Sequence, residues 1–339
     1  MIKDFIKMSH YAGMREDLVQ AGGGNSAYKI SPDKMIIKAS GYPLAELSEE
    51  DGYSVVNPKI ITAAFSDQAQ PDNLTEEDAK KILRDAWIDG KRPSIETFLH
   101  AIAGKYTLHT HPVAVNVLAC RKQGVKELQR LFPQAWIIPY ATPGIELAKV
   151  FFQTAKASDQ KKPDVIFLLN HGLLISGDSA QQVMERTEQT VRKIEQALGL
   201  QMQEYHYATE LWNLFADGIV WNVTDVHVRL AYQKLHGLWE HAFCPDCVVF
   251  LGKKIWETDL LEEKNLEAFR DVYGEPSVIL YRGYLYLHAP SVKKALEMQS
   301  VLSFSAQVML AQDQENYSLL SEQEQDFLLH WEAETYRKR

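Results

Sequence analysis

Apolar and polar residues alternate with both helical and strand periods through the first two-thirds of the chain. The helical period predicts an opening helix that runs to about Val19 and ends before three consecutive glycines at 22–24. Two short strands over 26–30 and 35–38 follow, joined by a Ser-Pro-Asp-Lys turn. Residues 66–91 are polar and acidic, so we expect a surface excursion there.

Helices and short apolar runs continue to alternate up to about residue 200. A helix is expected over 95–103 with Ser94 as its N-cap, and 105–109 has the pattern of a strand. Pro112 lies where a following helix would begin. The remaining elements are buried strands over 136–139 and 165–169 and an amphipathic helix over 179–198 that ends at Gly199. This order predicts an α/β fold with a mixed central sheet and helices on both faces.

The pattern changes beyond about residue 205. Residues 225–241 have a helical period and are rich in His and Trp, and a Cys-Pro-Asp-Cys loop follows at 244–247. The later elements are expected to be strands over 248–251, 277–281 and 284–288 and helices from Ser291 and from about Ser321 to the basic end at 337–339. We therefore expect two domains, one over 1–205 and a smaller α+β accessory region over 206–339; the candidate catalytic residues given below all fall in 1–205.

Composition narrows the class of protein without naming it. The 339 residues are 46% hydrophobic and 24% charged, as in an ordinary soluble globular protein. A formal net charge of −9 argues against general binding to nucleic acid or to anionic membranes, although a local basic pocket remains compatible with it. No apolar run approaches the roughly 18 residues of a membrane span, and three cysteines are too few for a disulfide scaffold. We expect a cytoplasmic protein with no nucleic-acid or membrane partner.

His109 and His111 are the strongest candidates for chemistry. They lie two residues apart on an expected strand, so both imidazoles point to one face and can bind one metal ion. His171 follows a buried strand and precedes a glycine; taken alone, it could equally be a turn histidine that caps a backbone group. Glu96 could be another ligand or simply an acid that complements the helix dipole. His100 shares the helix face of Glu96 but has only its spacing to support it.

Small polar residues and glycines recur in three expected loops. The loops are Gly22-Gly23-Gly24-Asn25-Ser26, Lys38-Ala39-Ser40-Gly41 and Pro93-Ser94. The first lacks the G-x-G-x-x-G spacing of a dinucleotide site, but backbone N–H groups in such loops can still bind an anion. Together the loops indicate a phosphate or carboxylate site. Cys244 and Cys247 could be half of a zinc site or a redox pair, but no second cysteine pair completes four ligands.

Read together, these segments resemble the class II aldolase/adducin family from about Leu18 to Leu198. The motifs that carry the resemblance, in family order, are Gly23-Gly24-Asn25-Ser26, Lys38-Ala39-Ser40-Gly41, Pro93-Ser94-Ile95-Glu96, His109-Thr110-His111-Pro112, Pro139-Tyr140-Ala141-Thr142-Pro143-Gly144 and Asn170-His171-Gly172-Leu173. The resemblance implies a three-layer α/β/α sandwich, usually assembled as a cyclic homotetramer.

The resemblance also implies a set of site residues. His109, His111 and His171 would bind Zn²⁺ or another divalent metal, and Glu96 would serve both as a ligand and as the catalytic base. The substrate phosphate would be held by Asn25, Ser40, Gly41 and Ser94. Two positions depart from the simple sugar-phosphate aldolases: Ile95 replaces a second serine, and no tyrosine lies between His111 and Tyr140 to act as the proton donor.

The implied activity is that of a Zn-dependent aldolase, a lyase of carbohydrate metabolism. It would cleave a phosphorylated ketose or a related sugar acid through a metal-stabilised enediolate. Family epimerases tend to have Asp where this chain has Glu96, which favours the aldolase. The alternatives are a sugar-phosphate epimerase or decarboxylase with the same metal site, and a non-catalytic binding module like adducin. A binding module has no need of four potential metal ligands.

Overall fold

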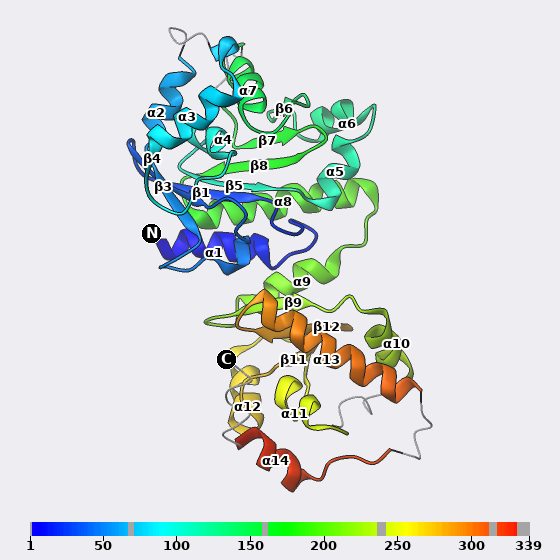
Figure 1. The fold of residues 1–339 in the computed structure, drawn as a ribbon. Coiled ribbons are helices and arrows are strands. Elements are labelled where there is room, and N and C mark those ends of the chain that lie inside the picture. Colours follow the sequence, from blue (N-terminus) through cyan, green and yellow to red (C-terminus); the bar gives the residue numbers. More distant parts are fainter. Residues whose placement is uncertain (1, 67–70, 158–161, 236–241, 312–316, 331–339) are drawn as a thin grey trace. The chain divides into compact units, whose positions relative to one another are not determined.

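The computed structural model describes residues 2–66, 71–157, 162–235, 242–311 and 317–330 (Figure 1). The chain divides into two compact units, Met1–Met202 and Gln203–Arg339. Each unit is built around its own β-sheet, of eight strands in the first and four in the second. The expected metal and phosphate residues all lie in the first unit.

The sheet of the first unit has the strand order β4-β3-β2-β1-β5-β8-β7-β6. Neighbouring strands are antiparallel except β6 and β7, which run parallel, so the sheet is mixed. The strands are β1 Asn25–Ser31, β2 Lys34–Lys38, β3 Tyr53–Val56, β4 Trp87–Gly90, β5 Tyr106–Thr110, β6 Trp136–Ile138, β7 Val165–Leu168 and β8 Gly172–Gly177. Strand β5 lies near the middle of the sheet and is buried along its whole length.

Helices cover both faces of this sheet, as Figure 1 shows. Helices α1 and α8 pack on one face, and α2, α3, α4 and α7 lie on the other. The helices are α1 Ile2–Gly13, α2 Pro58–Ala64, α3 Glu76–Ala86, α4 Thr97–Ile102, α5 Val113–Ala119, α6 Gly124–Leu131, α7 Ile145–Ala157 and α8 Ala180–Leu198, with short 3₁₀ turns at Leu44–Glu46 and Pro71–Asn73. The predicted three-layer α/β/α sandwich with a mixed central sheet is confirmed.

Apolar residues with the period of each element account for this layering. Ile37 of β2, Phe98 of α4 and Ile145 of α7 are fully buried in one core cluster between the sheet and its outer helices. The same two helices add Leu99 and Leu147 to a second cluster over β6, β7 and β8. Helix α4 therefore lies against the sheet at its centre, and this places the helix start beside β5.

The sequence predictions for two segments before β5 are wrong, besides the N-cap of α4. The opening helix ends at Gly13 rather than near Val19, because the chain turns there to bury the Arg15 guanidinium, which contacts Asp17 at 2.7 Å and Glu188 at 2.6 Å. The acidic stretch 66–91 is not merely a surface excursion, since within its described part it forms α3 and β4. A Thr75–Asp78 capping box starts α3, and only one narrow side of this charged helix is buried.

The second unit is α+β, as expected. Its sheet has the order β10-β11-β12-β9, with β10 and β11 parallel and the other pairs antiparallel. Its elements are α9 Gln203–Trp212, β9 Ile219–Asn222, α10 Val226–Leu235, α11 Pro245–Leu251, β10 Trp256–Thr258, α12 Glu263–Tyr273, β11 Val278–Tyr281, β12 Tyr284–Ala289, α13 Val292–Leu310 and α14 Glu322–His330. The ends of the helices expected to reach 241 and 339 lie outside the described residues.

The strand expected over 248–251 is wrong, because α11 occupies this segment. Pro245 is at the first helical position, where its fixed φ favours a helix and its missing N–H costs nothing. Cys247, Val248 and Leu251 then face the interior at helical spacing. The described residues contain no helix that is both long and apolar enough to cross a bilayer.

Candidate metal centre

Three elements of the first unit bring the expected metal ligands together. His109 lies on β5, His111 directly follows that strand, and His171 lies in the turn between β7 and β8. Glu96, rather than the predicted Ser94, is the N-cap residue of α4, because the helix begins at Thr97. Strand β5 is hydrogen-bonded to β1 and β8, so its histidines are fixed in direction by the middle of the sheet.

The backbone of the β7–β8 turn sets the position of His171. Asn170 has a φ of 54°, a left-handed conformation that Asn adopts more readily than most residues. Gly172 lies so close to β5 that a Cβ atom there would be 2.2 Å from the Thr110 carbonyl oxygen. The Asn116 side chain donates to the His171 carbonyl oxygen at 3.2 Å. The Asn-His-Gly sequence is therefore needed for the shape of this turn.

The ligand atoms of Glu96, His109, His111 and His171 all lie within 4.8 Å of one another. The Nε2 atom of His109 is 3.1 Å from that of His111, 3.2 Å from that of His171 and 3.2 Å from a Glu96 carboxylate oxygen. In the described part of the chain, no other group of three or more such side chains has this geometry. The structure thus brings together all four residues that the sequence predicted as ligands.

Hydrogen bonding shows why this cluster fits a metal ion. The Nδ1 atom of His109 lies 3.0 Å from the Leu173 carbonyl oxygen, which can only accept a hydrogen bond. A neutral His109 therefore carries its proton on Nδ1 and directs the Nε2 lone pair toward His111 and His171. Nitrogen lone pairs and a carboxylate that converge in this way need a cation between them, and three histidines with one carboxylate suit Zn²⁺.

The charges in the cluster also favour metal binding. Burial, together with the neighbouring His109 and His171, lowers the pKa of His111 to about 3, so the ring is neutral at physiological pH. Burial alone would raise the pKa of Glu96, but the positive charge that His109 has when it is protonated, and hydrogen bonds with the His109 and His171 rings, outweigh burial and hold that pKa well below its usual value. Glu96 is therefore a carboxylate, ready to bind a cation.

The glycine-rich loop packs directly against His109 and His111 of the metal cluster. A Cβ atom on Gly23 would lie 3.1 Å from the His111 Nδ1 atom, and one on Gly24 would lie 3.0 Å from the His109 carbonyl oxygen. Asn25 is fully buried and pairs with His109 across β1 and β5. Its side-chain oxygen accepts a hydrogen bond from the Ser26 N–H at 2.9 Å, whereas its Nδ2 atom has no partner among the described residues.

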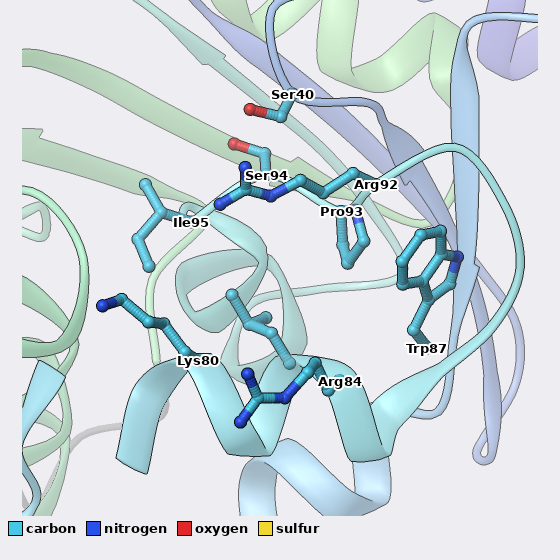
Figure 2. Close-up of a pocket in the computed structure, with 9 residues that line it drawn as sticks. Ser40, Lys80, Arg84, Trp87, Arg92, Pro93, Ser94 and Ile95 are labelled. Atoms are coloured by element: carbon cyan, nitrogen blue, oxygen red, sulfur yellow. The ribbon is translucent and has the colours of Figure 1, made fainter. Parts of the chain in front are cut away.

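Ser40 and Ser94 line one cavity of about 560 Å³ (Figure 2). Their loops are joined by a bridge between Ala39 and Pro93 and by a hydrogen bond from the Ser40 N–H to the Arg92 carbonyl oxygen at 3.0 Å. Gly41 has a φ of 71°, and open space surrounds the position of a Cβ atom there. The structure therefore brings together the Lys38–Gly41 and Pro93–Ser94 loops, and the second of these leads directly to Glu96 of the metal cluster.

Lys38 is a site residue that the sequence reasoning did not single out. Its side chain is buried at the end of β2, and its ammonium donates to the Tyr42 carbonyl oxygen at 2.7 Å. Burial lowers its pKa, and the charge of Glu96 partly raises it again. The available signal was a lysine directly after three apolar strand residues, because a charge at such a position is rarely buried without a partner.

His100 and the two cysteines lie outside the metal cluster. His100 is buried, with its Nδ1 atom 2.5 Å from the Thr107 hydroxyl, and burial lowers its pKa to about 3. The Cys244 and Cys247 sulfurs are 3.4 Å apart in the second unit. No further His, Cys, Asp or Glu of the described chain joins them in a metal-type group.

Comparison with known proteins agrees with this geometry. Residues 3–198 match the family described as the class II aldolase and adducin N-terminal domain, and the chain belongs to this family. A search of curated proteins finds no match. One similar solved structure is the N-terminal class II aldolase domain of a conserved protein from Thermoplasma acidophilum, with 26% identity and a TM-score of 0.51 over 58% of this chain and 93% of that chain.

Two further structures are more distant. YgbL from Klebsiella pneumoniae, described as a candidate aldolase, epimerase or decarboxylase, has 17% identity and a TM-score of 0.43, over 60% of this chain and 90% of that chain. The l-fuculose-1-phosphate aldolase of Thermus thermophilus has 14% identity and a TM-score of 0.39, over 58% of this chain and 92% of that chain.

Proposed function

We propose that the protein is a metal-dependent aldolase that cleaves a phosphorylated ketose or a related sugar acid. The observation that carries this proposal is the convergence of His109, His111, His171 and Glu96, with the His109 lone pair directed into the cluster. Membership of the class II aldolase and adducin family supports lyase chemistry at such a site. A purely structural module would not need this set of ligands.

The three histidines and Glu96 would hold a divalent cation, for which Zn²⁺ is our proposal. When bound, such an ion supplies Lewis acidity toward the carbonyl and hydroxyl oxygens of the substrate. Glu96 has a side chain only 15% exposed, at the edge of the cluster. A carboxylate at this position can take up and return the proton at the carbon next to the substrate carbonyl, while the buried surroundings exclude water. In the cleavage direction, the C4 hydroxyl would lose its proton as the C3–C4 bond breaks, which releases an aldehyde. Glu96 in its protonated form would then give a proton to C3 of the remaining enediolate, which yields dihydroxyacetone phosphate, so that in net terms one proton moves from the C4 hydroxyl to C3.

The phosphate of the substrate is proposed to lie against Asn25, Ser40, Gly41 and Ser94. The unpartnered Nδ2 atom of Asn25 is a buried donor that a substrate oxygen would satisfy. The hydroxyls of Ser40 and Ser94 line one cavity, and the bare backbone at Gly41 permits close approach of an anion. We also propose that the protein is a homotetramer, as the family resemblance implies, and that it is cytoplasmic, as expected from the sequence.

A second candidate is a sugar-phosphate epimerase or decarboxylase that uses the same metal site. This second candidate is supported by the absence of tyrosine between His111 and Tyr140. In the simple sugar-phosphate aldolases, the tyrosine that donates the proton for aldol cleavage is expected in that segment. All of these activities would use the same metal site. An epimerase would add the cleaved aldehyde back instead of releasing it, whereas a decarboxylase would break the bond to a carboxylate carbon and release carbon dioxide.

A product assay separates these activities. We expect the metal-loaded protein to release dihydroxyacetone phosphate or another cleavage fragment from at least one member of a panel of ketose phosphates and phosphorylated sugar acids. The release should be measured with a coupled assay and confirmed by mass spectrometry, with chelator-treated protein as the control. An epimer or carbon dioxide without any cleavage fragment would contradict the aldolase assignment.

A further inference from the structure

The cavity that contains Ser40 and Ser94 is larger and more basic than one phosphate group requires. Figure 2 shows the serines and Arg92 along one wall, with Lys80 and Arg84 extending from α3 on another. At about 560 Å³ the cavity has the volume of a site for a whole small ligand. A single phosphate would fill only a small part of it.

The charge of this cavity is opposite to that of the chain. Its lining includes three cationic side chains and no carboxylate, whereas the chain has a net charge of −9. Lys80 has a weak, exposed ion pair with Glu77 at 3.1 Å. Arg84 and Arg92 form no ion pair or side-chain hydrogen bond with any described residue. Two unpaired guanidinium groups that face one cavity are suited to bidentate binding of phosphate oxygens.

The position of the cavity connects it to the proposed reaction. Ile95 lines the cavity and is followed directly by Glu96, so adjacent residues of one short segment belong to the cavity and to the metal cluster. Ile95 occupies the position where the simple aldolases have a second serine, and it forms an apolar wall together with the exposed Trp87. The chain therefore has fewer hydroxyls at the phosphate position and more positive charge just beyond it.

We propose that Arg84, Arg92 and Lys80 form a second anion subsite, and that the substrate carries a diphosphate or an equally charged pair of adjacent anionic groups. This inference rests on the proposed function for the reaction that the substrate undergoes. A phosphate monoester carries a charge of only about −1.5 to −2 near neutral pH, which leaves part of this basic lining unmatched. A second anionic group would match the remaining charge.

The test is a comparison of pyrophosphate with inorganic phosphate by titration calorimetry on the full-length protein. Because pyrophosphate also chelates metal ions, the same titrations are done on the metal-loaded protein and on a His109→Ala variant. We expect pyrophosphate to bind at least about tenfold more tightly than phosphate to both proteins. Equal binding of the two anions would overturn the proposal.

Single-residue variants test whether the subsite arginines cause the preference for pyrophosphate over phosphate. Arg84→Gln and Arg92→Gln should each weaken pyrophosphate binding by about tenfold. Arg130→Gln, which removes the same charge from an exposed site on α6, should leave binding unchanged. Unchanged affinity in the two subsite variants, or an equal loss in Arg130→Gln, would overturn the proposal. A change of oligomeric state at unchanged affinity would also overturn it, since the cavity would then be a subunit contact.

The outcomes for the subsite and for the proposed function are separate. Anion binding is measured without turnover and in a variant that lacks a metal ligand. A preference for pyrophosphate in a chain that binds no metal would leave the subsite standing and contradict the aldolase. Metal binding and cleavage activity without this preference would contradict the subsite alone.

Discussion

Glu96→Gln is expected to lower kcat by about 10²–10⁴-fold at saturating metal concentration, the usual contribution of a positioned acid–base group. The amide has nearly the shape of the carboxylate, but it cannot accept a proton. The three histidines remain to hold the metal, so metal content should change far less than kcat. The measurement is kcat for the substrate identified in the product assay, with metal content determined on the same samples.

Glu146→Gln is the matched control for this change. Glu146 lies in the first turn of α7, half-exposed, and pairs only with Lys149 at 2.7 Å among the described residues, so its loss should leave kcat within about twofold of the wild type. If Glu96→Gln retained more than about a third of the wild-type kcat, Glu96 would not be the base. Recovery of full activity on addition of excess metal would reduce its role to that of a ligand.

Gly172→Ala is expected to destabilise the first unit by about 2–4 kcal/mol and to weaken metal binding. A Cβ atom at this position would lie 2.2 Å from the Thr110 carbonyl oxygen and 3.0 Å from the His111 ring, so β5 and β8 must separate or the ring must move. For a unit of this size the melting temperature should fall by roughly 5–15 °C. Differential scanning calorimetry measures this fall directly.

Gly22→Ala provides the control, because no atom lies within 4 Å of the Cβ position and the backbone there is not left-handed. It should melt within about 2 °C of the wild type. A Gly172→Ala protein with wild-type melting temperature and metal content would show that the turn does not need glycine, and that the Asn-His-Gly sequence has another purpose.

Two of the metal ligands could be predicted from local rules, because His109 and His111 share a face in any strand. His171, which taken alone could equally be a turn histidine, was predicted as a ligand through the family resemblance. The spacing alone left Glu96 open between helix dipole and ligand. The structure adds that Glu96 is the N-cap of α4, where the packing of Phe98 and Leu99 against the sheet brings its carboxylate to the histidines.

Other parts of the fold and of the site depend on contacts between segments of the chain, and a local sequence pattern does not indicate such contacts. Arg84 reaches the cavity only because α3 and β4 form in a stretch whose charges resemble a surface loop. The burial of Lys38 depends on the Tyr42 carbonyl oxygen in the following loop. In the second unit, Val248 and Val249 favour a strand by type, but Pro245 and the surrounding apolar core select a helix.

The central claim is that His109, His111, His171 and Glu96 hold one divalent metal ion, and elemental analysis of the purified protein by mass spectrometry tests it most directly. We expect about one equivalent of a divalent metal, zinc being our proposal, per wild-type chain and less than about 0.2 in His109→Ala. The exposed His227→Ala should keep the wild-type value. A wild-type content below about 0.2 per chain that does not change in His109→Ala would contradict the metal site and the aldolase built on it.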